Sequence, residues 1–126
     1  MNLEKAQAAA KAALEKFHYK DICTVSEYKD DTDTKTKITK KKEVIVLENI
    51  PCKISFETIK NAEQTETATA ISQVIKLFLS PDITISPGSK ITVTNDGRTV
   101  AYKQSGEAAV YPSHQEIMLI LFEGWA

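Results

Sequence analysis

Two histidines and two cysteines are the side chains in this sequence best suited to chemistry. An imidazole can move protons near neutral pH, and a thiolate can act as a nucleophile or a metal ligand. His18 and His114 have no serine or cysteine placed by a recognisable local motif, and Cys23 and Cys52 form no Cys-x-x-Cys pair and have no histidine nearby that would complete a zinc set. We therefore expect free, half-buried thiols, no catalytic or metal-binding residue and no cofactor. A catalytic pair formed only in the folded chain is the alternative.

Three further segments contain residue types that bind ions or phosphate. Asp30, Asp31 and Asp33 suggest a cation site, but the glycine and the distal glutamate of an EF-hand loop are missing. The sequence SPGSK at 86–90 resembles the end of a phosphate loop, but it lacks the first glycine and a following helix, so we expect a turn. The basic run 35–42 contains no aromatic residue on which a base could stack. We expect a solvated loop there, and a nucleic-acid-binding barrel is the alternative function.

Length and composition predict one globular domain, residues 1–126. The chain is 42% apolar and 26% charged, which is ordinary for a soluble protein with a single core. Its 16 basic and 17 acidic residues give a net charge of −1, so no global field attracts nucleic acid or an anionic membrane. No stretch resembles a signal peptide or approaches the roughly 20 apolar residues of a membrane span, so we expect a cytosolic protein without a membrane partner.

The stretch from Ile71 to Thr94 organises the rest of the chain. Its apolar run at 74–79 alternates so that one face is wholly apolar, which predicts a central strand buried on at least one side. The run at 115–123 is apolar on both faces, which predicts a second central strand that is buried on both sides. These two strands should share one core.

Shorter alternating runs predict the other strands. Asp96-Gly97 lies between two of them and predicts a tight hairpin with a positive φ at Gly97. Glu48-Asn49 leaves open whether its surroundings form one long strand or two short ones. No helical pattern lies between the strands, so the fold class is mainly β, a small antiparallel barrel or sandwich of six to seven strands within residues 20–123. The shorter runs lie at 21–28, 44–47, 50–56, 91–94 and 99–102.

An amphipathic helix at 2–17 should precede the barrel, and two polar segments, 29–42 and 57–70, should form long loops. The first can order itself only as a solvated hairpin tip, and the second is either a long mobile loop or a short helix. The apolar stripe of the helix is mostly alanine, which buries little area, so the helix packs either on one end of the domain or on a partner. Trp125 should enter either its own core or a neighbouring subunit. The residues that would dock are Leu3, Ala6, Ala10, Ala13, Leu14, Phe17 and Trp125.

Five segments, in this order, carry a family resemblance: HYKDICTVSEY, VIVLENIPCKISFETIK, ISQVIKLFLSPDITISPGSKITVT, NDGRTVAYKQSG and AVYPSHQEIMLILFEGWA. Together they make residues 18–126 similar to phage head–tail joining, or head-completion, proteins, and specifically to the group of the phage-like element PBSX protein XkdH. None of the segments is a catalytic motif, and the specificity lies in their order. The alanine-rich helix and the polar segment at 29–42 depart from the group.

The resemblance implies a structural protein and not an enzyme. Members are small β-barrels that assemble as a ring beneath the portal, bridge it to the tail and help to retain packaged DNA. The implied partners are further copies of the chain, a portal or adaptor protein and a tail-completion protein, with DNA near by. The implied location is the bacterial cytoplasm during assembly and then the virion neck.

The resemblance also implies a channel loop. In related stopper proteins a long loop between the second and third strands projects into the channel and can close it. The matching segment here is 57–70, and its channel residues would be Glu57, Thr58, Lys60, Asn61, Glu63, Gln64, Thr65, Glu66 and Thr67.

Two competing classes are distinguished by simple observations. Salt-sensitive binding of single-stranded DNA would favour the nucleic-acid-binding barrel. A ligand-sized apolar pocket in which His114 has a strongly shifted pKa would favour a small enzyme.

Overall fold

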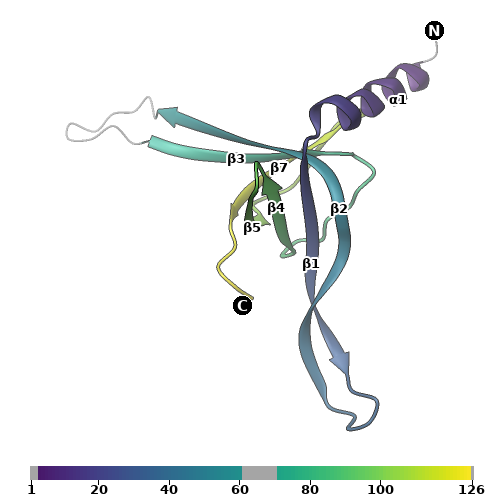
Figure 1. Ribbon diagram of the computed structural model, residues 1–126, viewed down its shortest axis with the longest axis vertical. Coiled ribbons are helices and arrows are strands. Elements are labelled where there is room, and N and C mark those ends of the chain that lie inside the picture. Colours follow the sequence, from purple (N-terminus) through teal and green to yellow (C-terminus); the bar gives the residue numbers. More distant parts are fainter. Residues whose placement is uncertain (1–2, 61–70, 126) are drawn as a thin grey trace.

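The computed structural model describes residues 3–60 and 71–125. Figure 1 shows a small β-rich body from which a helix and two hairpins extend. Helix α1 leads directly into one turn of π-helix, η1, so the helical segment reaches His18 and not residue 17. The elements are α1 (Leu3–Ala13), η1 (Leu14–His18), β1 (Asp21–Thr32), β2 (Thr39–Lys60), β3 (Ile71–Leu79), β4 (Lys90–Asn95), β5 (Arg98–Gln104), β6 (Ala109–Val110) and β7 (Gln115–Leu121).

The strands form a sheet that closes on itself. Its order is β3-β2-β1-β4-β5-β7-β6, and β7 also pairs with β3, so six strands complete a barrel and the short β6 adds beside β7. Every pairing is antiparallel. The mainly β fold with a preceding helix is therefore confirmed, and within the described residues it has seven strands.

The core of the barrel lies where the two predicted central strands meet. Leu77 of β3 pairs with Ile117 of β7, and both side chains are fully buried together with Leu79. Val25 and Ile91 complete the layer from the opposite strands, β1 and β4. Burial of a side chain of this size contributes roughly 1.5–3 kcal/mol relative to leaving it exposed. The shared core predicted for these strands is thus confirmed.

The prediction that the last strand is buried on both faces is wrong. Ile117 and Leu119 face the core, but Met118 and Ile120 are 38% and 45% exposed. The barrel wall is a single sheet, so alternate residues of each strand must face outward. The apolar residues on the second face of β7 therefore lie on the outer surface.

β2 is one long strand that bends at two irregularities. Its 22 residues pair with β1 at one end and with β3 at the other, and the register with β1 slips on either side of Val25. Glu48-Asn49 falls in one of these bulges, where Asn49 has a φ of 54°. Asparagine tolerates this left-handed conformation better than most residues. The open question at Glu48-Asn49 is settled as a bulge within one strand.

Both predicted long loops are shorter than expected because strands continue into them. Residues 29–32 belong to β1 and residues 39–42 to β2, which leaves only 33–38 as a turn. Residues 57–60 belong to β2 and pair with residues 71–74 of β3. Polar and charged residues can form solvated β-strands when a partner strand supplies the backbone hydrogen bonds. The remainder of the second loop, 61–70, lies outside the described residues.

The turn between β4 and β5 has the predicted form. Asn95 pairs with Arg98, so Asp96 and Gly97 are its two central residues, and their φ angles are 48° and 78°. Positive φ at both central residues is the signature of the type I′ turn that suits a two-residue hairpin.

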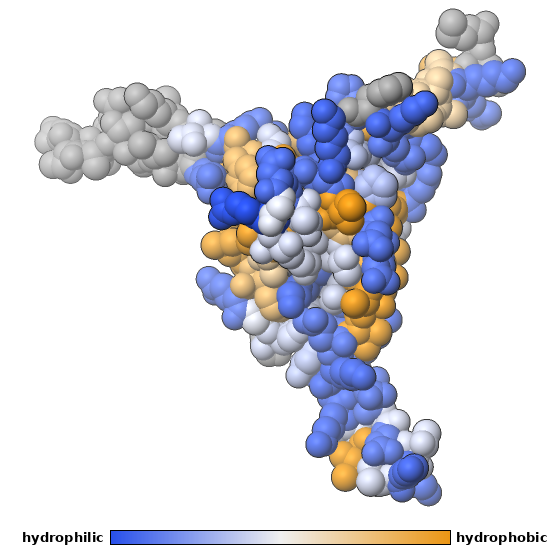
Figure 2. Space-filling model, in the orientation of Figure 1, coloured by the Kyte–Doolittle hydropathy of each residue, from blue (hydrophilic) through white to orange (hydrophobic). Residues whose placement is uncertain are grey.

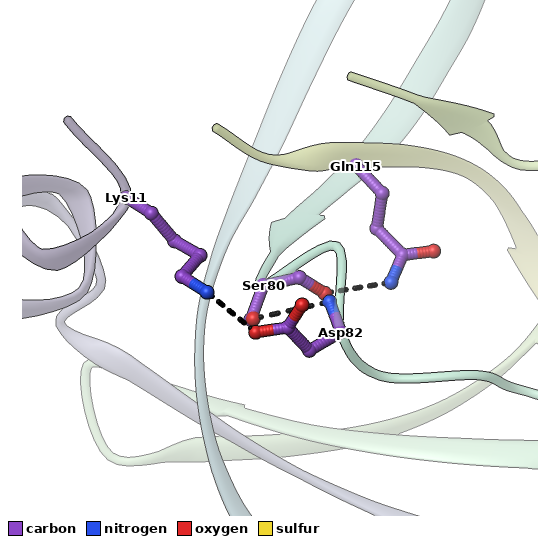
Figure 3. Close-up of polar contacts among 4 residues, drawn as sticks. All are labelled: Lys11, Ser80, Asp82 and Gln115. Carbon is purple, nitrogen blue, oxygen red and sulfur yellow. Dashed lines mark hydrogen bonds and ion pairs between the residues drawn. The ribbon is translucent and has the colours of Figure 1, made fainter. Parts of the chain in front are cut away.

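Polar contacts at one end of the barrel connect it to the helix. The Lys11 ammonium donates to the Asp82 carboxylate at 2.6 Å, and the Asp82 amide donates to Ser80 Oγ at 3.3 Å. The Gln115 amide group donates to the carbonyl oxygen of Ser80 at 2.7 Å (Figure 3). It also donates to the carbonyl oxygen of Ile83 at 2.5 Å. Gln115 is buried, so these bonds satisfy a polar group in the barrel and fix the β3–β4 connection that carries Asp82.

Candidate assembly surfaces

Two hairpin extensions project from the barrel, and we call them the β1–β2 ribbon and the β2–β3 ribbon. In the β1–β2 ribbon, residues 27–32 pair with 39–44, beyond the end of the pairing between β1 and β4. In the β2–β3 ribbon, residues 57–60 pair with 71–74, beyond the pairing between β3 and β7, which begins at Ile75. Figure 1 shows the ribbons and α1 pointing in three directions from the body.

The β2–β3 ribbon carries the described part of the predicted channel residues. Glu57 and Thr58 are exposed on β2, and the backbone of Lys60 ends the strand. Phe56 is 51% exposed, although the preceding inward-facing residue, Ile54, is only 7% exposed. The apolar inner face of the barrel wall thus continues outward onto the ribbon, where solvent reaches it. The other predicted channel residues, Asn61, Glu63, Gln64, Thr65, Glu66 and Thr67, lie outside the described residues.

The predicted docking stripe of the helix does not pack on the barrel. No residue of α1 is buried, Leu3 is 70% exposed, and Ala6, Ala10 and Ala13 are exposed. Leu14, in η1, is half-buried. The side chain of Phe17 lies outside the described part of the structure. The helical segment was predicted to pack either on its own domain or on a partner. It packs on its own domain only through its last turn.

Trp125 packs on its own subunit. Its ring stacks on Tyr28 with the centroids 5.1 Å apart and meets the edge of Phe122 at 4.9 Å. Its indole Nε1 donates to Glu43 Oε1 at 3.2 Å, and the same oxygen accepts from Lys90 at 3.1 Å. Because the ring is half-buried, the cluster lies on the outer surface at the base of the β1–β2 ribbon.

Opposite charges face each other across the β1–β2 ribbon. Asp30 pairs with Lys41 and Asp31 with Lys40, so the basic run predicted at 35–42 is interleaved with carboxylates. The only aromatic residue on the ribbon is Tyr28, which is stacked on Trp125. A surface that binds single strands needs cationic groups together with free aromatic faces. The β1–β2 ribbon therefore does not favour binding of single-stranded nucleic acid.

The outer barrel surface carries apolar residues on two opposite sides, which sequence reasoning missed. Ile22 of β1 is 46% exposed and pairs with Pro51, which is also exposed. Met118 and Ile120 of β7 form the second group. In the closed order β3-β2-β1-β4-β5-β7, β1 and β7 are three strands apart in either direction, so they lie on opposite sides. The sequence signal for this outer surface is the presence of apolar residues on both faces of the last strand, a pattern that also fits a strand buried on both sides.

The two cysteines are free, and both are completely buried. They lie on the adjacent strands β1 and β2, so the expected half-burial is wrong because both face inward. The hydrogen bond to Cys23, together with burial, raises the pKa of the Cys52 thiol. A protonated thiol without access to solvent is a poor nucleophile, so the pair serves packing.

The described residues contain no group of three or more His, Cys, Asp or Glu side chains that could hold a metal ion. Within the same residues, no helix is long and apolar enough to cross a membrane.

The fold and surfaces define a small closed antiparallel barrel with projecting ribbons. No protein-family model matches the sequence, and no curated protein matches it. Among solved structures, the phage-like element PBSX protein xkdH from Bacillus subtilis is similar, with 11% sequence identity over 82% of this chain and 95% of that chain and a TM-score of 0.48. At this identity and TM-score, the likeness says nothing about what this chain binds or does.

Proposed function

We propose that this chain is a structural protein of a phage or prophage neck, a ring subunit that joins the head portal to the tail. The observation that carries the proposal is the β2–β3 ribbon, which extends beyond the barrel between the second and third strands. This is the position at which the sequence resemblance implies a channel-facing projection. The packaged DNA would pass close to this ribbon, and the ribbon would help to close the channel.

The two apolar sides of the barrel support ring assembly. A closed ring uses a heterologous interface, in which one surface of a subunit contacts a different surface of the next. Ile22 with Pro51 on one side, and Met118 with Ile120 on the other, supply two such surfaces. Each group is small, so a stable contact needs further area from a ribbon or from the helix.

The exposed helix supports a contact with another protein. Its alanine stripe allows a close approach of a partner but buries little area in a single contact. Such a weak contact becomes effective when a ring repeats it. We assign the partner of α1 to the portal or adaptor protein, and we assign the opposite end of the ring to the tail-completion protein. On this proposal the protein acts in the bacterial cytoplasm during assembly, then stays in the virion neck, and is not an enzyme.

Inactivation of the gene in the bacterium that carries it tests the proposal. We expect electron microscopy to show DNA-filled heads without tails, with DNA lost from the heads, and we expect a plasmid copy to restore tailed particles. Normal tailed particles in the absence of the gene would exclude the neck function.

A paired variant tests the ring. Ile120→Glu places a charge on one apolar side and should abolish higher oligomers in the presence of the portal, as measured by analytical ultracentrifugation. Thr84→Glu changes an exposed residue of the β3–β4 connection and serves as the control. Equal oligomerisation of both variants would exclude β7 from the ring contact.

A further inference from the structure

A cleft of about 400 Å³ lies between the last turn of the helical segment and the barrel. It is separate from the ribbons and from the two apolar sides of the barrel. One wall comes from the end of the helical segment, another from β2 and β3, and the third from the residues that precede β7. Its lining residues are Leu14, His18, Tyr19, Lys53, Phe78, Ser113 and His114. A largely apolar cleft with a few converging polar groups is the usual form of a small-molecule site.

The imidazole of His114 is held in a fixed orientation in this cleft. Its ring stacks on Tyr111 with the centroids 4.9 Å apart and meets Phe78 at 6.2 Å. Nδ1 lies 3.1 Å from the Ser113 hydroxyl, and Nε2 lies 3.6 Å from the Glu116 carboxylate. Both ring nitrogens of His114 thus have partners, and its ring forms a fixed wall of the cleft.

Two other polar side chains of the lining are unpaired. Lys53 and His18 have no side-chain hydrogen bond or ion pair within the described part of the chain. Lys53 lies directly opposite Phe78 in the β2–β3 pairing, so an ammonium group and an aromatic ring border the same space. Tyr19 contributes its ring, and its buried hydroxyl has no hydrogen-bond partner among the described residues. This set can offer donors to an anion but offers few acceptors to a cation.

We propose that this cleft is a binding site for a small carboxylate attached to an aromatic or branched apolar group. The apolar group would pack between Leu14, Phe78 and the Tyr19 ring. The carboxylate would accept hydrogen bonds from the Lys53 ammonium and from the His18 imidazole. A cationic ligand would meet Lys53, and a fully apolar ligand would leave the ammonium without a partner.

The same chemistry has two sources, which are a free organic acid and an acidic residue beside an aromatic residue in a partner protein. Phenylacetate represents the first, and the capped dipeptide N-acetyl-aspartyl-phenylalanine amide represents the second. Phenylacetamide is the uncharged match to phenylacetate. Each probe is titrated into the full ¹⁵N-labelled chain, and amide chemical shifts are followed by NMR.

We expect phenylacetate to shift the amides of Tyr19, Lys53 and Ser113 and to bind roughly tenfold more tightly than phenylacetamide, because the charged group gains a charge-assisted hydrogen bond. Lys53→Gln should remove that difference. Lys40→Gln, at the far end of the β1–β2 ribbon, should leave it unchanged. Phe78→Leu should weaken both probes, since it removes the aromatic wall but keeps an apolar side chain at the position.

The outcomes distinguish a free acid from a partner segment, and they show whether the proposed site is wrong. Tighter binding of the dipeptide than of phenylacetate assigns the cleft to a partner segment, and the reverse assigns it to a free acid. The proposal is overturned if no probe shifts the cleft amides, if phenylacetamide binds as well as phenylacetate, or if Lys53→Gln changes neither affinity. These results are independent of the neck function, because its test by gene inactivation does not depend on a ligand in the cleft.

Discussion

The two ribbons leave the same barrel and share one long strand, yet they are stabilised in different ways. The β1–β2 ribbon is polar along most of its length and closes in a local turn, where the Asp33 carbonyl accepts from the Lys37 amide at 2.7 Å and Asp33 Oδ1 accepts from the Lys35 amide at 2.9 Å. Figure 2 shows its hydrophilic surface, with one apolar spot near the tip, where Ile38 is exposed. The hydrogen bonds of this turn fix the register of the ribbon at its tip.

The β2–β3 ribbon depends instead on the barrel. Its strands continue the inward-facing line of Cys52, Ile54 and Phe56 from the core toward solvent, and exposure rises along this line from 0% to 7% and then 51%. The comparison shows that an extension can be supported by its own turn or by the core behind it. At the base of the β2–β3 ribbon, the exposed Phe56 supplies apolar surface of the kind that an assembly contact uses, whereas Tyr28 at the base of the β1–β2 ribbon stacks on Trp125.

The largest effect is expected at the core that supports the β2–β3 ribbon. Leu77→Ala removes a fully buried side chain and should lower the free energy of unfolding by about 2–5 kcal/mol, as measured by urea denaturation. Lys76→Ala, the next residue on the outer face, should cost far less. If both variants lost the same stability, the assignment of inner and outer faces would be wrong.

A smaller loss is expected in the hairpin that carries no ribbon. Gly97→Val forces a β-branched residue into a φ of 78° and should cost roughly 1 kcal/mol or more. Gly97→Asn should cost less, because asparagine tolerates that conformation. Thermal unfolding measures both, and a neutral valine variant would contradict the type I′ turn.

Asp33→Ala should loosen the β1–β2 ribbon without unfolding the barrel. It removes the side-chain bond to the Lys35 amide, which is worth about 0.5–1.5 kcal/mol, and the loss should stay local. Hydrogen exchange should speed up in residues 29–42 and stay unchanged in β3 and β7. Faster exchange throughout the barrel would show that this ribbon is not an independent unit.

Phe56→Ser tests the β2–β3 ribbon, where the expected effect is on attachment to heads and not on local stability. Because the ring is about half exposed, the stability change should be small, about 0.5 kcal/mol, whereas attachment to heads should fall. Co-sedimentation with DNA-filled heads measures attachment, and Lys40→Gln serves as the control. Normal attachment of the serine variant would remove this residue from the assembly contact.

Deletion of residues 1–16 should have the smallest effect on stability. No residue of α1 is buried, and a surface ion pair between Lys11 and Asp82 connects the helix to the barrel. The hydrogen bond to Asp82 raises the pKa of Lys11, so the pair persists through neutral pH and is lost only as the pH rises through that raised value. The shortened chain should melt near the temperature of the full chain and fail to join heads. Unfolding would make the helix a core element, and normal joining would remove its docking role.

The sequence predicted the parts of the fold whose patterns are local. Asp96-Gly97 specifies its turn by backbone conformation alone, and the alternation at 74–79 identifies the core strand. It failed where a pattern has two physical meanings. Apolar residues on both faces of β7 fit either a buried strand or a barrel strand with an outer contact, and only closure of the sheet distinguishes them.

The candidate sites were less predictable. The polar segments 29–42 and 57–70 contain few apolar residues, but strand pairing orders residues 29–32, 39–42 and 57–60 without them. The cleft around His114 could not be found, because its residues come from four separate parts of the chain and meet only after the barrel closes.

Barrel closure also restricts where this protein can aggregate. A sheet that closes on itself leaves unpaired backbone groups mainly along the ribbons, and such exposed strands are templates for fibril growth. Along the β1–β2 ribbon, the charged Asp and Lys side chains oppose stacking of one copy on another in register, because like charges would meet. The polar character of this ribbon thus disfavours fibril growth along its exposed strands.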